Sequence, residues 1–126
     1  RENNFKLHTN FLNKYSNFFI LPKQLPGSRS GWLAYPITIK KNAPFSRKEM
    51  QIFLEKKNIQ TRVIFTGNIL RQPGFKNIKA KIDRKGYPEA DKVMRSGILI
   101  ACHHGLTKKM INHIHKTIEE FILNYS

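Results

Sequence analysis

The chain has 126 residues, of which 40% are hydrophobic, and its 23 Lys and Arg residues against 8 Asp and Glu residues give a formal net charge of +15. This length suits a single compact domain, and the composition excludes a largely disordered chain and a bilayer-spanning apolar run. The one cysteine excludes an internal disulfide and any cysteine-ligated cluster held by this chain alone.

The first third of the chain is predicted to form a helix followed by two strands. Apolar residues at helical spacing predict a helix over residues 3–17, and a short apolar run follows at residues 18–21. A polar loop then leads to a strand over residues 32–40, with alternate residues facing a core. Pro36 cannot donate a ladder hydrogen bond, so this strand is expected at a sheet edge or at a bulge.

The middle third is predicted to hold a helix, a strand and a polar loop. Ser46 and Glu49 have the spacing of a capping box, which starts a helix that ends near residue 58. Residues 59–65 alternate as in a strand. The sequence FTGNILRQP (residues 65–73) follows as a loop, and residues 76–85 form the one densely basic segment.

The last third is predicted to form a short helix, a central strand and a long helix. Pro88 suits the first turn of a helix, and the run of residues 98–102 is apolar on both faces, as in a central strand. Thr107 caps the last helix, whose apolar stripe is formed by Ile111, Ile114, Ile118, Phe121 and Ile122. The order of elements predicts an α+β fold in one domain over residues 1–126, with a small, mostly antiparallel sheet covered by helices on one face.

The positive charge makes polyanions the first partners to consider: nucleic acid, anionic lipid or phosphorylated small molecules. Basic residues run along the whole chain, however, and no RNP-type aromatic motif, GXXG loop or zinc-ligand spacing accompanies them. A solvated surface is therefore favoured, and a nucleic-acid-binding module remains the alternative from another functional class.

No signal peptide opens the chain, so a cytoplasmic location without membrane association is expected. Because the first residue is Arg1, the sequence is expected to be part of a longer protein.

The titratable residues do not form a complete catalytic set. His103 and His104 end the central strand, whereas His113 and His115 lie two apart on a helix and so point in different directions. Strand-end and surface histidines are favoured over a metal site. Cys102 lies in an apolar strand, which favours a buried, inert thiol over a nucleophile. We assign no catalytic residue and no metal ligand to this chain.

The loop of residues 65–73 carries the residue types of a ligand site. Gly67 and Asn68 end a strand with exposed backbone amides, and Arg71 offers a bidentate fork for a phosphate or a carboxylate. The alternative is a helical turn with solvated polar side chains. Composition alone leaves both interpretations open.

An ordered series of motifs resembles the C-terminal small domain of the DegT/DnrJ/StrS family of pyridoxal-phosphate-dependent nucleotide-sugar aminotransferases, and within it most closely the RfbH-like branch of CDP-4-keto-6-deoxyglucose 3-dehydrases. The resemblance covers nearly the whole chain. The motifs are FFILP (18–22), SGWLAYPITI (30–39), FSRKE (45–49), LEKKNIQTR (54–62), FTGNILRQP (65–73), YPEAD (87–91) and CHHGLT (102–107).

The resemblance implies the last part of a fold-type-I enzyme of lipopolysaccharide O-antigen deoxysugar synthesis that acts as a homodimer. A large N-terminal domain holds pyridoxal or pyridoxamine phosphate, and an iron–sulfur centre supplies electrons for removal of the 3-hydroxyl of a CDP-hexose. None of that machinery matches a position in this chain. The expected partners are that large domain and the sugar nucleotide, and no cofactor is held by this chain alone.

The resemblance also implies substrate-facing residues: Arg62, Asn68, Arg71 and, less directly, Gln72. In ordinary aminotransferases of the family, this segment carries a histidine within a Pro-x-His pattern. Here Gly67 and Asn68 stand in that region, which favours the dehydrase. A sister nucleotide-sugar aminotransferase remains the alternative.

Overall fold

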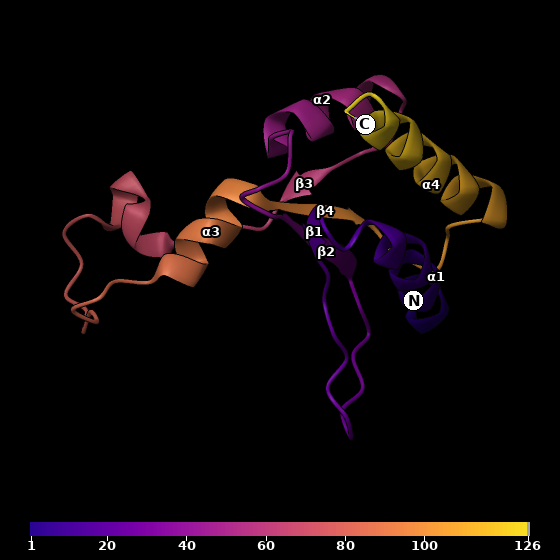
Figure 1. Ribbon diagram of the computed structural model, residues 1–126. Helices are drawn as coiled ribbons and strands as arrows, with labels where there is room; N and C mark the ends of the chain where they lie inside the picture. Colours follow the sequence, from indigo (N-terminus) through magenta and orange to yellow (C-terminus); the bar gives the residue numbers. More distant parts are fainter. Residues whose placement is uncertain (126) are drawn as a thin grey trace.

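Four short antiparallel strands form the sheet, in the order β1-β2-β4-β3 (Figure 1). This computed structural model describes residues 1–125. The two inner strands, β2 and β4, are the longest, and the core face of each is buried. The strands are β1 (Phe19–Ile20), β2 (Ala34–Ile39), β3 (Arg62–Val63) and β4 (Gly97–Ala101).

Helices α1 (Glu2–Leu12), α2 (Arg47–Lys56) and α4 (Lys108–Leu123) pack over one face of the sheet, whereas α3 (Pro88–Ser96) leads directly into β4 (Figure 1). Alternate residues of β2 point into the core between sheet and helices, as the period-2 pattern predicts. The predicted α+β fold, with an antiparallel sheet covered by helices, is confirmed. The buried side chains of the two inner strands are Tyr35, Ile37, Ile39, Ile98 and Ile100.

The last helix and the central strand form where the sequence predicts them. Thr107 caps α4 by accepting a hydrogen bond from the backbone N–H of Met110 at 3.2 Å. The predicted apolar stripe of α4 is buried: Ile111, Ile114, Ile118, Phe121 and Ile122. None of the helices among residues 1–125 has the length and apolarity needed to cross a bilayer.

The strand predicted over residues 59–65 is shorter in the structure. The backbone N–H and the hydroxyl of Thr61 both donate to Glu55 Oε1, at 2.7 and 3.0 Å, so this part of the segment is bound to α2. Asn58 and Phe65 have left-handed φ angles of 63° and 47°, which turn the chain out of the extended conformation on both sides. Only Arg62 and Val63 remain to pair with β4.

Pro36 lies in the interior of the strand order, not on an outer strand. The prediction of an edge strand is wrong for β2 as a whole, since β1 and β4 flank it. However, β1 pairs only with Thr38 and Ile39, so Pro36 has a paired strand on one side alone, where it lies opposite Leu99. A residue without an N–H donor is tolerated there because the other side needs no ladder hydrogen bond.

The capping box of α2 forms only in part. Ser46 Oγ accepts a hydrogen bond from the backbone N–H of Glu49 at 3.2 Å, as the pattern predicts. The carboxylate of Glu49 instead accepts a hydrogen bond from the hydroxyl of Tyr125 at 2.8 Å. This contact ties the start of α2 to the end of α4.

A histidine pair, with His8 buried and His115 half-buried, joins α1, α4 and the sheet. His8 Nε2 donates to the carbonyl oxygen of Ala101 at 2.9 Å, so His8 Nδ1 accepts from His115 Nε2 at 2.9 Å. The ring of His115 also stacks on Phe11 at 4.2 Å between centroids. The sequence predicted His115 as a surface histidine; it is half-buried instead, because α1 covers part of it. The strand-end His103 and His104 are exposed as predicted.

We expect this pair to make stability depend on pH. Burial lowers the pKa of His8 from its usual value, and burial, followed by the nearby His8, lowers the pKa of His115 to about 4. The unfolded chain therefore takes up protons near pH 6.5 that the folded chain does not. The contribution of this pair to the free energy of unfolding should be fully present above pH 6.5. It should fall by about 1–2 kcal/mol towards pH 4, since partial exposure of His115 limits the effect.

Urea titrations at several pH values test this expectation with two variants. His115→Gln keeps a donor for His8 Nδ1 but does not titrate, so the loss of stability between pH 6.5 and 4 should become smaller. His104→Gln, at an exposed position, is the control and should leave the pH dependence unchanged. An equal pH dependence in His115→Gln and the unmodified protein would contradict the assignment.

Candidate functional site

The segment after β3 folds into two consecutive 3₁₀ turns, η2 (Ile69–Arg71) and η3 (Pro73–Phe75), of which η2 is bound to α3. Gly67, which has a φ of 67°, is where this segment comes close to α3. A Cβ atom on Gly67 would lie 2.3 Å from the Cβ of Met94 and 2.6 Å from its Cα. Glycine is therefore needed at this position both for its backbone conformation and for close contact with α3.

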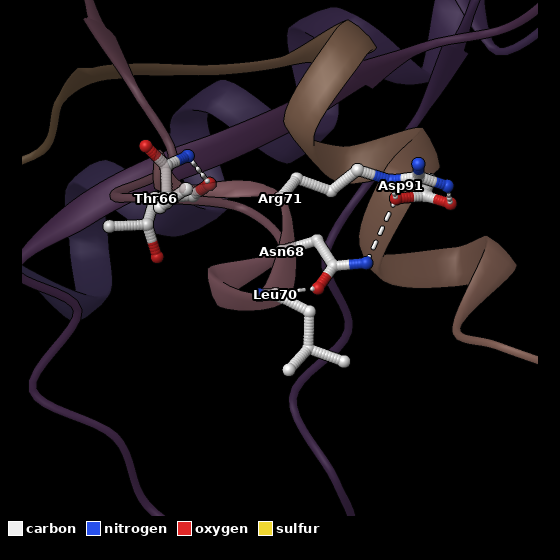
Figure 2. A network of polar contacts seen from close by, with 6 residues as sticks. Thr66, Asn68, Leu70, Arg71 and Asp91 are labelled. Atoms are coloured by element: carbon white, nitrogen blue, oxygen red, sulfur yellow. Dashed lines mark hydrogen bonds and ion pairs between the residues drawn. The ribbon is translucent and has the colours of Figure 1, made fainter. Parts of the chain in front are cut away.

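Asn68 connects η2 to α3. Its Oδ1 accepts from the backbone N–H of Leu70 at 3.1 Å, which caps the turn, and its Nδ2 donates to Asp91 Oδ1 at 2.9 Å (Figure 2). The residue is only 7% exposed. Asn68 is thus bound to the protein and not solvated. The helical turn that one of the two sequence interpretations predicted does form.

Arg71 forms a bidentate ion pair with Asp91 (Figure 2). Its Nε and Nη2 donate to Oδ1 and Oδ2, each at 2.9 Å. The Arg71 side chain is 62% exposed, whereas that of Asp91 is only 13% exposed. The hydrogen bond from Arg71, followed by that from Asn68, lowers the pKa of Asp91 to about 2, so the carboxylate stays ionised at any physiological pH.

Asp91 is a site residue that sequence reasoning missed. It lies in the YPEAD motif and suits the positive end of a helix, which gave no reason to connect it with a loop twenty residues earlier. The available signal was charge: acidic residues are scarce, and this one follows a loop that carries Arg71. The pairing itself depends on how α3 folds back over the loop.

The other two predicted residues do not join the Asn68–Arg71–Asp91 cluster directly. Gln72 Nε2 donates to the carbonyl oxygen of Thr66 at 3.1 Å and so connects the two ends of the loop. Arg62 lies on β3 opposite Leu99, with an exposed side chain. Among residues 1–125, no hydrogen bond or ion pair links Arg62 to the cluster. The structure thus brings together two of the four predicted residues and adds Asp91.

A pocket of about 340 Å³ lies beside this cluster. Asn68, Arg71 and Asp91 line one part of it, and Lys85 and Tyr87 line another. The latter two belong to an exposed loop, residues 76–87, which leads into the end of α3 that lies away from the sheet (Figure 1). A larger pocket of about 550 Å³, near His103 and His113, contains none of the predicted site residues.

No group of three or more His, Cys, Asp or Glu side chains among the described residues is placed to hold a metal ion. His113 Nε2 contacts the carbonyl oxygen of Lys57 at 2.8 Å. Cys102 is fully buried, as predicted, and burial raises the pKa of its thiol. A buried thiol with a raised pKa is a poor nucleophile.

Comparison with known proteins identifies the chain's relatives. The profile of the DegT/DnrJ/EryC1/StrS aminotransferase family matches residues 1–119. The lipopolysaccharide biosynthesis protein RfbH of Salmonella typhimurium is 32% identical over 126 residues, which are 99% of this chain and 29% of that protein. A dTDP-4-dehydro-2,6-dideoxy-D-glucose 3-dehydratase of Saccharopolyspora spinosa is 34% identical over 107 residues, 85% of this chain and 23% of that protein.

Solved structures share the fold at lower sequence identity. An aminotransferase from Psychrobacter cryohalolentis superposes with a TM-score of 0.82 at 15% identity, over 98% of this chain and 33% of its own. The E. coli GDP-4-keto-6-deoxy-D-mannose-3-dehydratase with bound hydrated PLP superposes with a TM-score of 0.75 at 20% identity, over 90% of this chain and 29% of its own. The chain therefore spans about a quarter to a third of the length of these proteins.

Proposed function

Because the chain belongs to the DegT/DnrJ/EryC1/StrS aminotransferase family, we propose that it is the C-terminal small domain of a PLP- or pyridoxamine-phosphate-dependent enzyme that acts on a nucleotide sugar. The reaction proposed for the whole enzyme is 3-dehydration of a CDP-4-keto-6-deoxyhexose in lipopolysaccharide biosynthesis. The similarity to RfbH supports the pathway, and the 3-dehydratase named among the relatives supports the reaction. The CDP group rests on the sequence resemblance described above.

Within that enzyme, we assign Asn68 and Arg71 to positioning the nucleotide sugar. The observation that carries this assignment is the exposed guanidinium of Arg71. Its Nε and Nη2 are held by Asp91, while its Nη1 makes no hydrogen bond within residues 1–125. A fixed arginine with a free donor is suited to a phosphate. Arg62 and Gln72 remain proposed substrate-facing residues, although neither joins the Asn68–Arg71–Asp91 cluster.

The residues present do not fit a complete PLP site. A PLP enzyme needs a carboxylate or arginine beside the pyridinium nitrogen, and the one carboxylate at this site, Asp91, is already bound to Arg71 and Asn68. Nor can the single buried Cys102 hold an iron–sulfur cluster. We therefore place cofactor chemistry in the part of the enzyme outside this chain, together with the large domain and the proposed dimer partner.

A sister nucleotide-sugar aminotransferase is the second candidate, since aminotransferases share both the family and the fold. The 65–73 loop favours the dehydrase, because Gly67 and Asn68 stand where the aminotransferases carry a histidine pattern. The close contact of Gly67 with Met94 leaves no room for a side chain there. Product analysis of the full-length enzyme distinguishes the two: a deoxygenated sugar without an added amino group supports the dehydrase.

Arg71→Ala in the full-length enzyme tests the substrate assignment. Loss of charge-assisted hydrogen bonds to the ligand should raise KM for the CDP-sugar by roughly 10- to 100-fold, with a smaller effect on kcat. Arg84→Ala is the matched control, because Arg84 is exposed in the nearby loop but does not line the pocket. Unchanged KM and kcat in Arg71→Ala would remove the assignment.

A further inference from the structure

We infer that Asp91 is a positioning residue, which holds the Arg71 guanidinium so that its free edge faces a diphosphate in the pocket that Lys85 and Tyr87 also line. The inference rests on the proposed function and adds to it a residue, a site and the part of the substrate that is recognised. Asp91 belongs to neither the predicted site residues nor the contacts expected from the family resemblance.

The first step of the argument is that Asp91 fixes both substrate-facing side chains at once. Its Oδ1 accepts from Arg71 Nε and from Asn68 Nδ2, and its Oδ2 accepts from Arg71 Nη2, all at 2.9 Å (Figure 2). An arginine held by two parallel bonds to a carboxylate has one defined orientation. Asp91 itself sits on the first turn of α3 and so belongs to the scaffold rather than to the loop.

The second step is the contrast in exposure across this ion pair. The Asp91 side chain is 13% exposed and the Arg71 side chain 62% exposed, so the carboxylate is on the inner side and the arginine presents its remaining edge outward. A long side chain that is already ordered loses less entropy when it binds a ligand. Asp91 therefore favours binding without touching the ligand.

The third step is the charge of the pocket. Arg71 and Lys85 line it as cations, and Asp91 is the one acid in its lining, with both oxygens engaged. The hydroxyl of Tyr87 accepts from the backbone N–H of Asp83 at 3.1 Å, which orders the loop that carries Lys85. Two cations from different segments facing about 340 Å³ of space match a diphosphate better than a neutral sugar.

A phosphate at this site has two sources in the full-length enzyme, the nucleotide sugar and the PLP cofactor. Both offer the same anionic oxygens to Arg71 and Lys85. We assign the site to the diphosphate of the nucleotide sugar, because two separated cations suit two phosphates. The binding constant for PLP, measured separately from KM, distinguishes the sources.

The test compares Asp91→Asn with Glu89→Gln in the full-length enzyme. Glu89 lies on the same first turn of α3, pairs with Lys92 at 3.3 Å and is 83% exposed, so its replacement removes the same charge without touching Arg71. Asp91→Asn should raise KM for the CDP-sugar roughly 5- to 30-fold, leave kcat within about twofold and leave PLP binding unchanged. Glu89→Gln should change none of these.

A double variant separates this inference from the proposed function. Because Asp91 acts chiefly through Arg71 and also holds Asn68, adding Asp91→Asn to Arg71→Ala should raise KM by much less than Asp91→Asn does alone. A raised KM in Arg71→Ala with an unchanged or lower KM in Asp91→Asn overturns the role of Asp91 and leaves the proposed function standing. The role of Asp91 is also overturned if the effects of the two variants on KM are fully additive. The same holds if Asp91→Asn lowers kcat as strongly as it raises KM, or if it weakens PLP binding. No effect of either single variant overturns both proposals.

Discussion

Replacing Gly67 by valine is expected to detach the 65–73 loop from α3 and to cost roughly 2–4 kcal/mol of stability, the sum of a left-handed backbone penalty and overpacking. Any side chain at this position would meet Met94, with a Cβ only 2.3 Å from the Met94 Cβ and 2.6 Å from its Cα. The Met94 backbone belongs to α3 and cannot yield as a flexible side chain does. The loop must therefore move, and it takes Asn68 and Arg71 away from Asp91.

Gly74→Ala provides the matched control for this prediction. Gly74 lies in the same region, but a Cβ there would have no heavy atom within 4 Å and its φ is not left-handed. Urea denaturation should show a large loss for Gly67→Val and a change within about 0.5 kcal/mol for Gly74→Ala. Limited trypsin digestion should also cleave the basic loop of residues 76–87 faster in Gly67→Val. Equal stability and equal cleavage of the two variants would contradict the account.

The second large effect is expected at His8. His8→Ala should lower the free energy of unfolding by about 3–5 kcal/mol, because it leaves a cavity and removes two buried hydrogen bonds. His8 is fully buried, and its ring donates to the Ala101 carbonyl oxygen and accepts from His115. The variant leaves both partner groups without their bond, and it removes the contact that joins α1 to β4 and α4.

His104→Ala serves as the control, since His104 is exposed and should tolerate the change within about 0.5 kcal/mol. Chemical denaturation at pH 7.5 compares the two variants without interference from histidine titration. A loss below about 1 kcal/mol for His8→Ala would mean that the pair contributes little and that α1 is held on the sheet by its other contacts, such as the hydrogen bond from Asn4 Nδ2 to the His103 carbonyl oxygen.

The elements that the sequence predicted well are those with a strong local pattern. The stripe of α4 repeats with the helical period, and Thr107 precedes it at the capping position, so both follow from neighbours in the chain. The run of residues 98–102 is apolar on both faces, which predicted a central strand, and β4 is flanked by β2 and β3. Such features need no knowledge of distant contacts.

The elements that the sequence predicted poorly depend on contacts between distant segments. The strand after residue 58 is short because Thr61 bonds to Glu55, which competes with the ladder. His115 is covered because α1, at the other end of the chain, lies against α4. For the candidate site, residue types made Asn68 and Arg71 candidates, but their common partner Asp91 comes from a helix whose orientation the local pattern does not fix.

The central claim is that Arg71 and its loop bind a nucleotide sugar, and a structure of the full-length enzyme with bound CDP-sugar tests it most directly. We predict Arg71 Nη1 within hydrogen-bonding distance of a diphosphate oxygen, with Nε and Nη2 still bound to Asp91. A diphosphate bound elsewhere, with residues 65–73 facing bulk solvent in the complex, would contradict the account.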